Sequence, residues 1–110
     1  MNKDENPLSI NPRSGYVFAL IAYDISSNKI RNLLIKILKS YGFRVQRSVF
    51  EAMISSKKLE ELCGKLKRFS KEKTKDTVRV YSIPYGGRLW TFGDHEEHSL
   101  INSSDEPIVI

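Results

Sequence analysis

The sequence predicts a single α+β domain in which strands and helices follow one another in the order βαββαβ. Three observations support this prediction. The chain has 110 residues, 40% of them hydrophobic, which is enough for one packed core. Two segments place apolar residues at helical spacing, and three others have the apolar content or the alternation that is typical of strands. The sequence contains no internal repeat that would favour a solenoid.

The first strand and helix are predicted over residues 16–23 and about 28–40. The run YVFALIAY is apolar on both faces, which is typical of a strand that is covered on both sides. In the following loop, Ser26 or Ser27 can cap the helix by accepting a hydrogen bond from a free backbone N–H. Apolar residues of the next segment recur on one helical face, and Gly42 is expected to end that helix as a C′ residue.

The second half of the domain has the same alternation of strand and helix. The pattern of residues 43–54 (FRVQRSVFEAMI) predicts one long strand, because no Gly, Pro or Asn marks a turn. Ser55 or Ser56 can cap a second helix, over about 57–69, whose apolar face includes Cys63 as a predicted core residue. Residues 77–83 alternate apolar and polar side chains and predict the last regular strand. This order of elements is the ferredoxin-like plan.

The two ends of the chain are expected to lie outside that domain, which spans residues 15–84. Residues 1–14 are polar and predict a disordered leader without the apolar segment of a signal peptide. Residues 85–110 form a C-terminal extension whose last residues, Pro107 to Ile110, predict a short strand. That strand would add to a sheet edge in this molecule or in a partner, and a disordered tail is the alternative.

A cytoplasmic location is expected, without any membrane association. The longest apolar run has eight residues, far fewer than the roughly 20 that cross a bilayer. The single cysteine cannot form an internal disulfide, which fits a reducing compartment.

The charge distribution indicates a partner that is a polyanion. The net charge is +5 and the pI is about 9.4. Residues 28–50 contain six basic residues and no acid, and residues 57–79 contain nine basic residues and four acids. Such a surface can concentrate nucleic acid by long-range attraction. The alternative is a solvated surface with an ordinary surplus of lysine.

Asp24 is the most informative candidate for chemistry. It is the only acid between Glu5 and Glu51, and it lies at the end of an apolar strand just before a helix. A carboxylate there can hold a hard divalent cation, and a two-fold dimer would bring a second Asp24 close to the first. Alternatively, Asp24 has no role in chemistry and is favoured there because the helix dipole stabilises an acidic residue near a helix N-terminus.

Other chemistry-bearing residues give weaker indications. The segment from Asp94 to His98 is not a zinc signature, and a solvated acidic tail is the simpler interpretation. Several aromatic side chains could stack on bases, although core packing is the usual role of such residues: Tyr23, Phe50, Tyr81, Tyr85 and Trp90. Base-specific recognition is therefore not predicted.

Three motifs together resemble one known family. They are YDI at residues 23–25, G-F-R-V-Q-R-S-V-F-E at 42–51 and D-T-V-R-V-Y at 76–81. The set resembles the Cas-two family of CRISPR-associated proteins, from about residue 16 to residue 83, and the terminal Ile108 to Ile110 resembles the family's extra strand. The leader before Tyr16 and the region 89–106 depart from the family pattern.

The resemblance implies a ferredoxin-like homodimer and divides residues 43–54 into two short strands. It also implies that Asp24 is a ligand for Mg²⁺ at the dimer interface. Tyr23, Arg31, Arg44 and Phe50 match positions that are implicated in nuclease activity, and Ser26 lies beside the metal-site loop. The implied partners are the Cas-one integrase and nucleic acid, which is duplex DNA or, for some members, single-stranded RNA.

Two classes of function stay open, and a third is weaker. In the first, the protein is a metal-dependent endonuclease or endoribonuclease, although no general base accompanies Asp24. In the second, it is a non-catalytic adaptor that binds duplex phosphates and docks the integrase during spacer acquisition. The third is a ribonuclease toxin of the virulence-associated type, which shares the fold.

Overall fold

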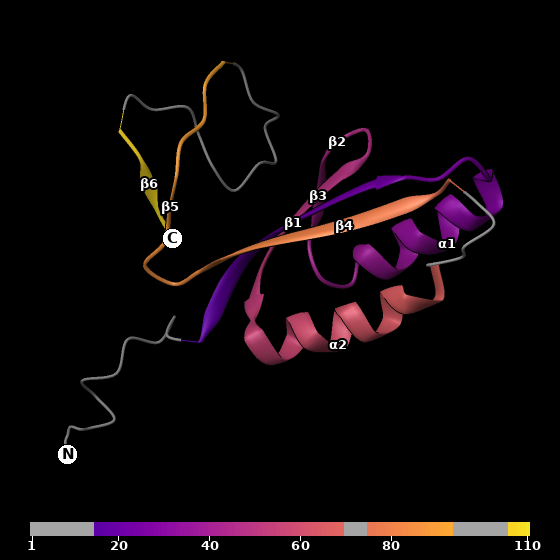
Figure 1. The fold of residues 1–110 in the computed structure, drawn as a ribbon, viewed down its shortest axis with the longest axis horizontal. Coiled ribbons are helices and arrows are strands. Elements are labelled where there is room, and N and C mark those ends of the chain that lie inside the picture. The colour runs from indigo at the N-terminus through magenta and orange to yellow at the C-terminus, as the bar shows by residue number, and fades with distance from the viewer. Residues whose placement is uncertain (1–14, 70–74, 94–105) are drawn as a thin grey trace.

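The computed structural model describes residues 15–69, 75–93 and 106–110 and has the ferredoxin-like order of elements. These are β1 (Tyr16–Asp24), α1 (Asn28–Leu38), β2 (Phe43–Gln46), β3 (Val49–Ser55), α2 (Ser56–Leu66), the 3-10 helix η2 (Lys67–Phe69), β4 (Thr77–Pro84), β5 (Arg88–Leu89) and β6 (Ile108–Val109). An antiparallel sheet has the strand order β2-β3-β1-β4. Both helices cover one face of this sheet, and β5 with β6 lies on the other side (Figure 1).

Strand β1 is central because its side chains are apolar on both faces. Alternate residues, Val17, Ala19, Ile21 and Tyr23, belong to the core between the sheet and the helices. Phe18 points to the opposite face, where it packs with Ile110 and with apolar side chains that include Leu89 of β5 and Ile108 of β6. The two-sided burial that the apolar run predicts is therefore present within one chain.

Serine side chains cap both helices at their first turns. The Ser27 side chain accepts a hydrogen bond from the Ile30 N–H, and the Ser55 side chain accepts one from the Lys58 N–H. Of the serines that the sequence offers at each helix start, these two are the caps. Leucines of both helices, such as Leu34 and Leu62, are fully buried against the sheet.

The prediction of one strand over residues 43–54 is wrong, and the division that the family resemblance implies is confirmed. Arg47 and Ser48 form a turn between β2 and β3. The Tyr23 N–H donates a hydrogen bond of 3.0 Å to the Ser48 carbonyl, so a contact distant in sequence fixes the turn. Because neither turn residue is Gly, Pro or Asn, the local pattern carries no turn signal.

Two residues, Gly42 and Cys63, have surroundings that differ from the prediction. Helix α1 is capped at Lys39, and Gly42 does not act as a left-handed C′ residue. Gly42 instead allows close approach of β3, since a Cβ atom there would lie 2.0 Å from the Glu51 carbonyl oxygen. Cys63 is exposed, not buried, because α2 packs through Leu62 and Leu66 and leaves Cys63 at the margin of the apolar face.

The C-terminal strand pairs within this molecule. Arg88 pairs with Val109 and Leu89 with Ile108, and the Ile110 N–H donates to the Gly87 carbonyl at 2.8 Å. Ile110 is buried against Phe18. The leader 1–14 and the segment Asp94 to His98 lie outside the described residues. Within the described part of the chain, no helix has the length and apolar character needed to cross a membrane.

Candidate functional site

A polar pocket of about 380 Å³ surrounds Asp24 at one end of the sheet. It is lined by Asp24, Ile25, Arg31, Arg44, Arg47 and Ser48, and we name it the Asp24 pocket. Asp24 is the last residue of β1, Arg31 lies in α1, Arg44 lies in β2, and Arg47 with Ser48 forms the β2–β3 turn. Three separate segments of the sequence, namely the end of β1, helix α1, and β2 with its following turn, thus bring three guanidinium groups and one carboxylate to the same pocket.

Hydrogen bonds hold the loop after Asp24 from two sides. On one side, Arg31 Nη1 donates to the Ile25 carbonyl at 2.6 Å, and Nη2 donates to the Asn28 side chain. On the other side, Asp76 Oδ1 accepts from the Ser26 N–H at 3.0 Å and from Ser26 Oγ at 3.1 Å. The loop that begins α1 is therefore fixed to α1 itself and to the start of β4.

Tyr23 and Phe50 lie beneath the pocket in the core. Only 4% of Tyr23 and 1% of Phe50 is exposed, and their ring centroids are 6.3 Å apart. The Tyr23 hydroxyl donates to the Arg47 carbonyl at 3.1 Å. Of the five residues that the family resemblance suggests for the site, the structure brings Asp24, Arg31 and Arg44 together in the Asp24 pocket and places Tyr23 and Phe50 behind it.

Arg47, Ser48 and Asp76 are contributors that the sequence reasoning did not single out as site residues. Arg47 belongs to the segment without acids, 28–50. The pattern of residues 43–54 predicted one continuous strand, and this prediction gave no reason to place Arg47 near Asp24. The turn at Arg47 brings its side chain to the pocket. Asp76 could have been suspected only from its place in the D-T-V-R-V-Y motif.

The pocket of one chain does not fit a magnesium ion by itself. Among the described residues that line it, Asp24 is the only carboxylate, and three arginines share the pocket with it. Among the residues that the structure describes, no group of three or more His, Cys, Asp or Glu side chains could hold a metal ion. Mg²⁺ prefers an octahedral shell of oxygen ligands, and neighbouring guanidinium groups oppose a dication.

The positive side chains of the pocket are open to a ligand. Among the described residues, neither the Arg44 nor the Arg47 guanidinium has a hydrogen-bond or ion-pair partner, and Asp24 forms no ion pair with them. Guanidinium groups bind phosphate oxygens through pairs of parallel hydrogen bonds. The arrangement is therefore suited to an anion such as a phosphate group.

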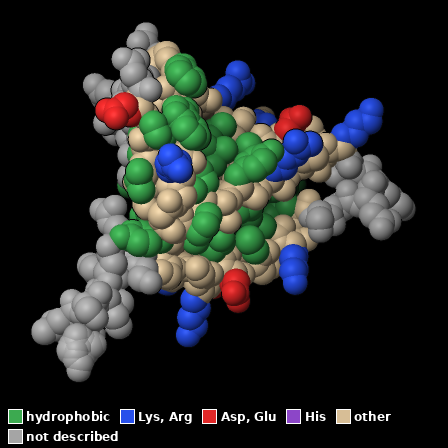
Figure 2. All heavy atoms as spheres, turned by 60° about the vertical axis from the view of Figure 1, so that its left-hand side comes forward, with side chains coloured by type: hydrophobic (Ala, Val, Ile, Leu, Met, Phe, Trp, Pro, Cys, Tyr) green, Lys and Arg blue, Asp and Glu red, His purple; other side chains and the backbone are tan. Residues whose placement is uncertain are grey.

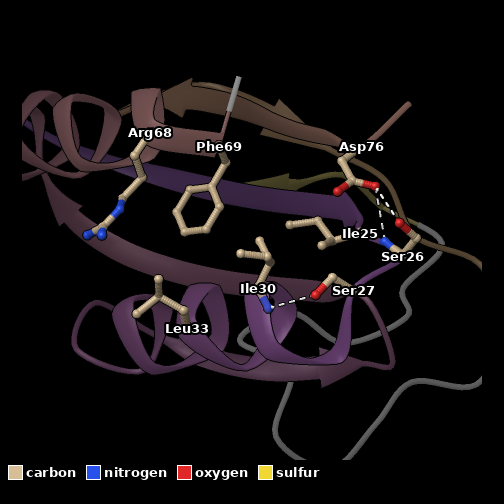
Figure 3. A pocket seen from close by; sticks show the side chains of 8 residues that line it. All are labelled: Ile25, Ser26, Ser27, Ile30, Leu33, Arg68, Phe69 and Asp76. Atoms are coloured by element: carbon tan, nitrogen blue, oxygen red, sulfur yellow. Dashed lines mark hydrogen bonds between the residues drawn. The ribbon is translucent and has the colours of Figure 1, made fainter. Parts of the chain in front are cut away.

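A second pocket, of about 290 Å³, lies on the helix side of the sheet (Figure 3). Apolar side chains of α1 and η2 form its walls, including Ile30, Leu33 and Phe69, and Arg68 lies at its margin. Its carboxylate, Asp76, is already bound to Ser26. This pocket offers no combination of groups for acid–base or nucleophilic chemistry.

The clearest electrostatic perturbation lies away from both pockets, between the two helices. The Tyr41 hydroxyl donates a hydrogen bond of 2.6 Å to Glu61 and, with the nearby Lys58 ammonium, lowers the pKa of the Glu61 carboxyl from its ordinary value. The Lys65 ammonium lies 5.1 Å from the centre of the Tyr41 ring, and contact with Tyr41 raises its pKa. This cluster joins the end of α1 to α2.

Comparison with known proteins gives a consistent result. The family model described as CRISPR associated protein Cas2 matches residues 17–87. A Mycobacterium tuberculosis protein named CRISPR-associated endoribonuclease Cas2 is 41% identical over 80 residues, which cover 70% of this chain and 69% of that protein. A Thermus thermophilus protein of the same name is 39% identical over 91 residues, covering 81% of this chain and 95% of that protein.

Two solved structures share the fold. The crystal structure of a hypothetical protein from Thermus thermophilus superposes with a TM-score of 0.60 at 36% identity, covering 74% of this chain and 95% of that chain. A structure described as cas2 gives a TM-score of 0.59 at 32% identity, covering 79% of this chain and 98% of that chain.

Proposed function

This chain belongs to the CRISPR associated protein Cas2 family, and we propose from that premise that it is a homodimeric adaptor that binds nucleic-acid backbone with the Cas-one integrase during spacer acquisition. The observation that carries the proposal is the Asp24 pocket. It combines three arginines with a single carboxylate, and two of the arginines have no partner among the described residues. Contacts to phosphate fix a protein on nucleic acid without reading sequence.

The helix-free face of the sheet supports the homodimer. The register places Phe43, Glu51, Leu20 and Tyr81 in one row across the four strands. The two aromatic ends of the row are 48% and 52% exposed, whereas Glu51 is already buried within the chain. Exposed aromatic side chains are typical of protein interfaces. Figure 2 brings forward the end of the molecule that carries β5 and β6, where further hydrophobic side chains gather.

The C-terminal extension supports a second protein partner. Trp90, Phe92 and Val109 flank or belong to the small β5–β6 sheet and are 53%, 80% and 66% exposed. Exposed aromatic side chains are typical anchors in protein interfaces. We assign this surface to the integrase, because the helix-free face of the sheet is proposed to bind the second copy.

Metal-dependent cleavage of RNA is the second candidate function. It is favoured by the endoribonuclease names of the relatives. Because the described residues of one chain do not fit Mg²⁺, this candidate requires the Asp24 of a second copy. Asp24 ends β1 on the same face as Leu20, which is the face that a dimer would bury.

Salt-dependent binding tests the adaptor function. Purified protein is titrated with duplex DNA and with single-stranded RNA, each of several unrelated sequences, from about 50 to about 200 mM salt. Affinity should fall steeply with salt and vary little with sequence, because phosphate contacts release counterions. Co-elution with a Cas-one integrase of the same organism should survive loss of Asp24. Salt-independent affinity, strong preference for one sequence, or failure to associate with the integrase would each contradict the adaptor.

A further inference from the structure

We infer that Arg47 is a phosphate-binding residue of the Asp24 pocket and that Tyr23 is the positioning residue that holds it there. The inference rests on the proposed binding of nucleic-acid backbone and specifies which side chains perform it. The β2–β3 turn then carries a ligand-binding residue. Tyr23 does not contact the ligand itself and instead holds the turn that carries Arg47.

Arg47 lies in the turn that joins β2 to β3. The turn of Arg47 and Ser48 follows β2 and returns the chain into β3, next to the end of β1. Both turn residues line the Asp24 pocket. The Arg47 side chain is exposed, and its guanidinium has no hydrogen-bond or ion-pair partner among the described residues. All of its N–H donors are therefore available to a ligand.

The other two arginines of the pocket, Arg31 and Arg44, differ in how many of their donors are free. Arg31 uses two of its nitrogens on the Ile25 carbonyl and the Asn28 side chain, so part of its donor capacity already serves the loop. Arg44 has its donors free within the described residues. Arg47 and Arg44, one in the turn and one in β2, are thus the pair best able to contact a phosphate group through several hydrogen bonds.

Two hydrogen bonds attach the turn to Tyr23. The Tyr23 N–H donates to the Ser48 carbonyl at 3.0 Å, and the Tyr23 hydroxyl donates to the Arg47 carbonyl at 3.1 Å. One residue therefore satisfies both carbonyls of the turn. Only 4% of Tyr23 is exposed and its ring packs near that of Phe50, so its hydroxyl is committed to the turn and shielded from a ligand in the pocket.

The test combines two single variants with their double variant. Arg47→Gln removes the charge, and Tyr23→Phe keeps the ring but removes the hydrogen bond to the Arg47 carbonyl. One lost phosphate contact should weaken duplex binding by on the order of fivefold to tenfold at about 0.1 M salt and lower the salt slope by about 0.9. Tyr23→Phe should have a smaller effect. The double variant should bind no more weakly than Arg47→Gln, because Tyr23 acts through Arg47.

Arg68→Gln is the matched control, since it removes the same charge from η2 on the helix side of the sheet. It should leave duplex affinity within about twofold of the wild type, as expected for an exposed charge away from the bound phosphates.

Inorganic phosphate provides a second probe that does not depend on nucleic acid. In NMR spectra, the Nε–H resonance that is lost in Arg47→Gln should shift as phosphate is added to the wild type. In Tyr23→Phe the same resonance should shift less at equal phosphate, because the turn is no longer held. The Arg68 Nε–H should stay in place.

The outcomes separate this inference from the proposed function. If the wild type binds duplex DNA and Arg47→Gln binds equally well, the role of Arg47 is overturned and the adaptor function stands. If Tyr23→Phe weakens binding as much in the Arg47→Gln background as in the wild type, the positioning role is overturned. If the wild type does not bind nucleic acid but phosphate shifts Arg47, the adaptor function fails and the phosphate site stands. If phosphate leaves Arg47 unchanged and no duplex binds, both fail.

Discussion

Asp24 carries the only negative charge among the described residues that line its pocket. In an adaptor that binds phosphate, this charge repels the ligand. In a metal-dependent nuclease, the same charge attracts the cation. A substitution that removes the charge and keeps the size should therefore change the two functions in opposite directions.

Asp24→Asn is the variant that makes this distinction. Duplex binding should persist or improve by up to a few fold, because one negative charge facing phosphate is gone. Any cleavage of RNA or duplex DNA should disappear, both in Asp24→Asn and in wild type with a chelator, since the amide does not attract Mg²⁺. Gel assays with the two nucleic acids give both results. Full cleavage by the variant, or chelator-resistant cleavage by the wild type, would refute the metal-dependent nuclease.

Substitution of alanine at two glycines should change the stability of the fold in opposite directions. A Cβ atom on Gly42 would collide with the Glu51 carbonyl oxygen and approach the Ala52 side chain, so Gly42→Ala should destabilise the fold by about 1–3 kcal/mol. Gly64 lies in α2, and a Cβ atom there would meet nothing within 4 Å, so Gly64→Ala should stabilise the fold by about 0.5–1 kcal/mol. Urea unfolding at one protein concentration measures both. Equal effects would contradict the close approach at Gly42.

At the scale of elements, the helices and the central strand could be predicted because their signals are local. Apolar spacing placed α1 and α2, and the two-sided apolar run placed β1. The β2–β3 turn could not be read from residues 43–54, because what fixes it is Tyr23, more than twenty positions away. For the same reason, the sequence pattern did not place Arg47 in the candidate site. The sequence predicted the C-terminal strand but could not decide whether it pairs within this molecule or with a partner, because strand pairing is not local.

The contact between the end of α1 and α2 gives a pH-dependent prediction. The Tyr41 hydroxyl and the Lys58 ammonium lower the pKa of Glu61, so Tyr41→Phe should raise that pKa toward its ordinary value. Because the pKa in the folded state is depressed, the stability that Tyr41 contributes is present above the ordinary carboxyl pKa. It is lost as the pH falls through the lower value in the folded state.

NMR titration of the Glu61 carboxyl measures this shift in the wild type and in the variant. Lys58→Gln is the matched control, and it should give a smaller rise because Lys58 is the lesser of the two causes. An unchanged Glu61 pKa in Tyr41→Phe would show that the hydrogen bond is absent in solution.

At the scale of the whole molecule, the two faces of the sheet are covered unequally. Both helices protect one face, while on the other face β5, β6 and Ile110 pack around Phe18. The row that ends in Phe43 and Tyr81 keeps its aromatic side chains exposed. A second copy placed face to face would bury the two aromatic ends of this row and bring the strand ends that carry Asp24 toward each other.

Tyr81→Glu tests this arrangement. Light scattering at micromolar concentration should give twice the 12.7 kDa chain mass for the wild type. The variant should give the mass of one chain, because burying an unpaired carboxylate in an apolar interface is strongly unfavourable. Leu33→Glu is the matched control: Leu33 is 37% exposed on α1, on the helix side of the sheet, so its variant should remain dimeric. A wild type of single-chain mass, or dissociation of both variants alike, would contradict a dimer formed through the helix-free face. A dimer that depends on Tyr81 and not on Leu33 would place the two Asp24 pockets in one assembly, where a single duplex could contact both.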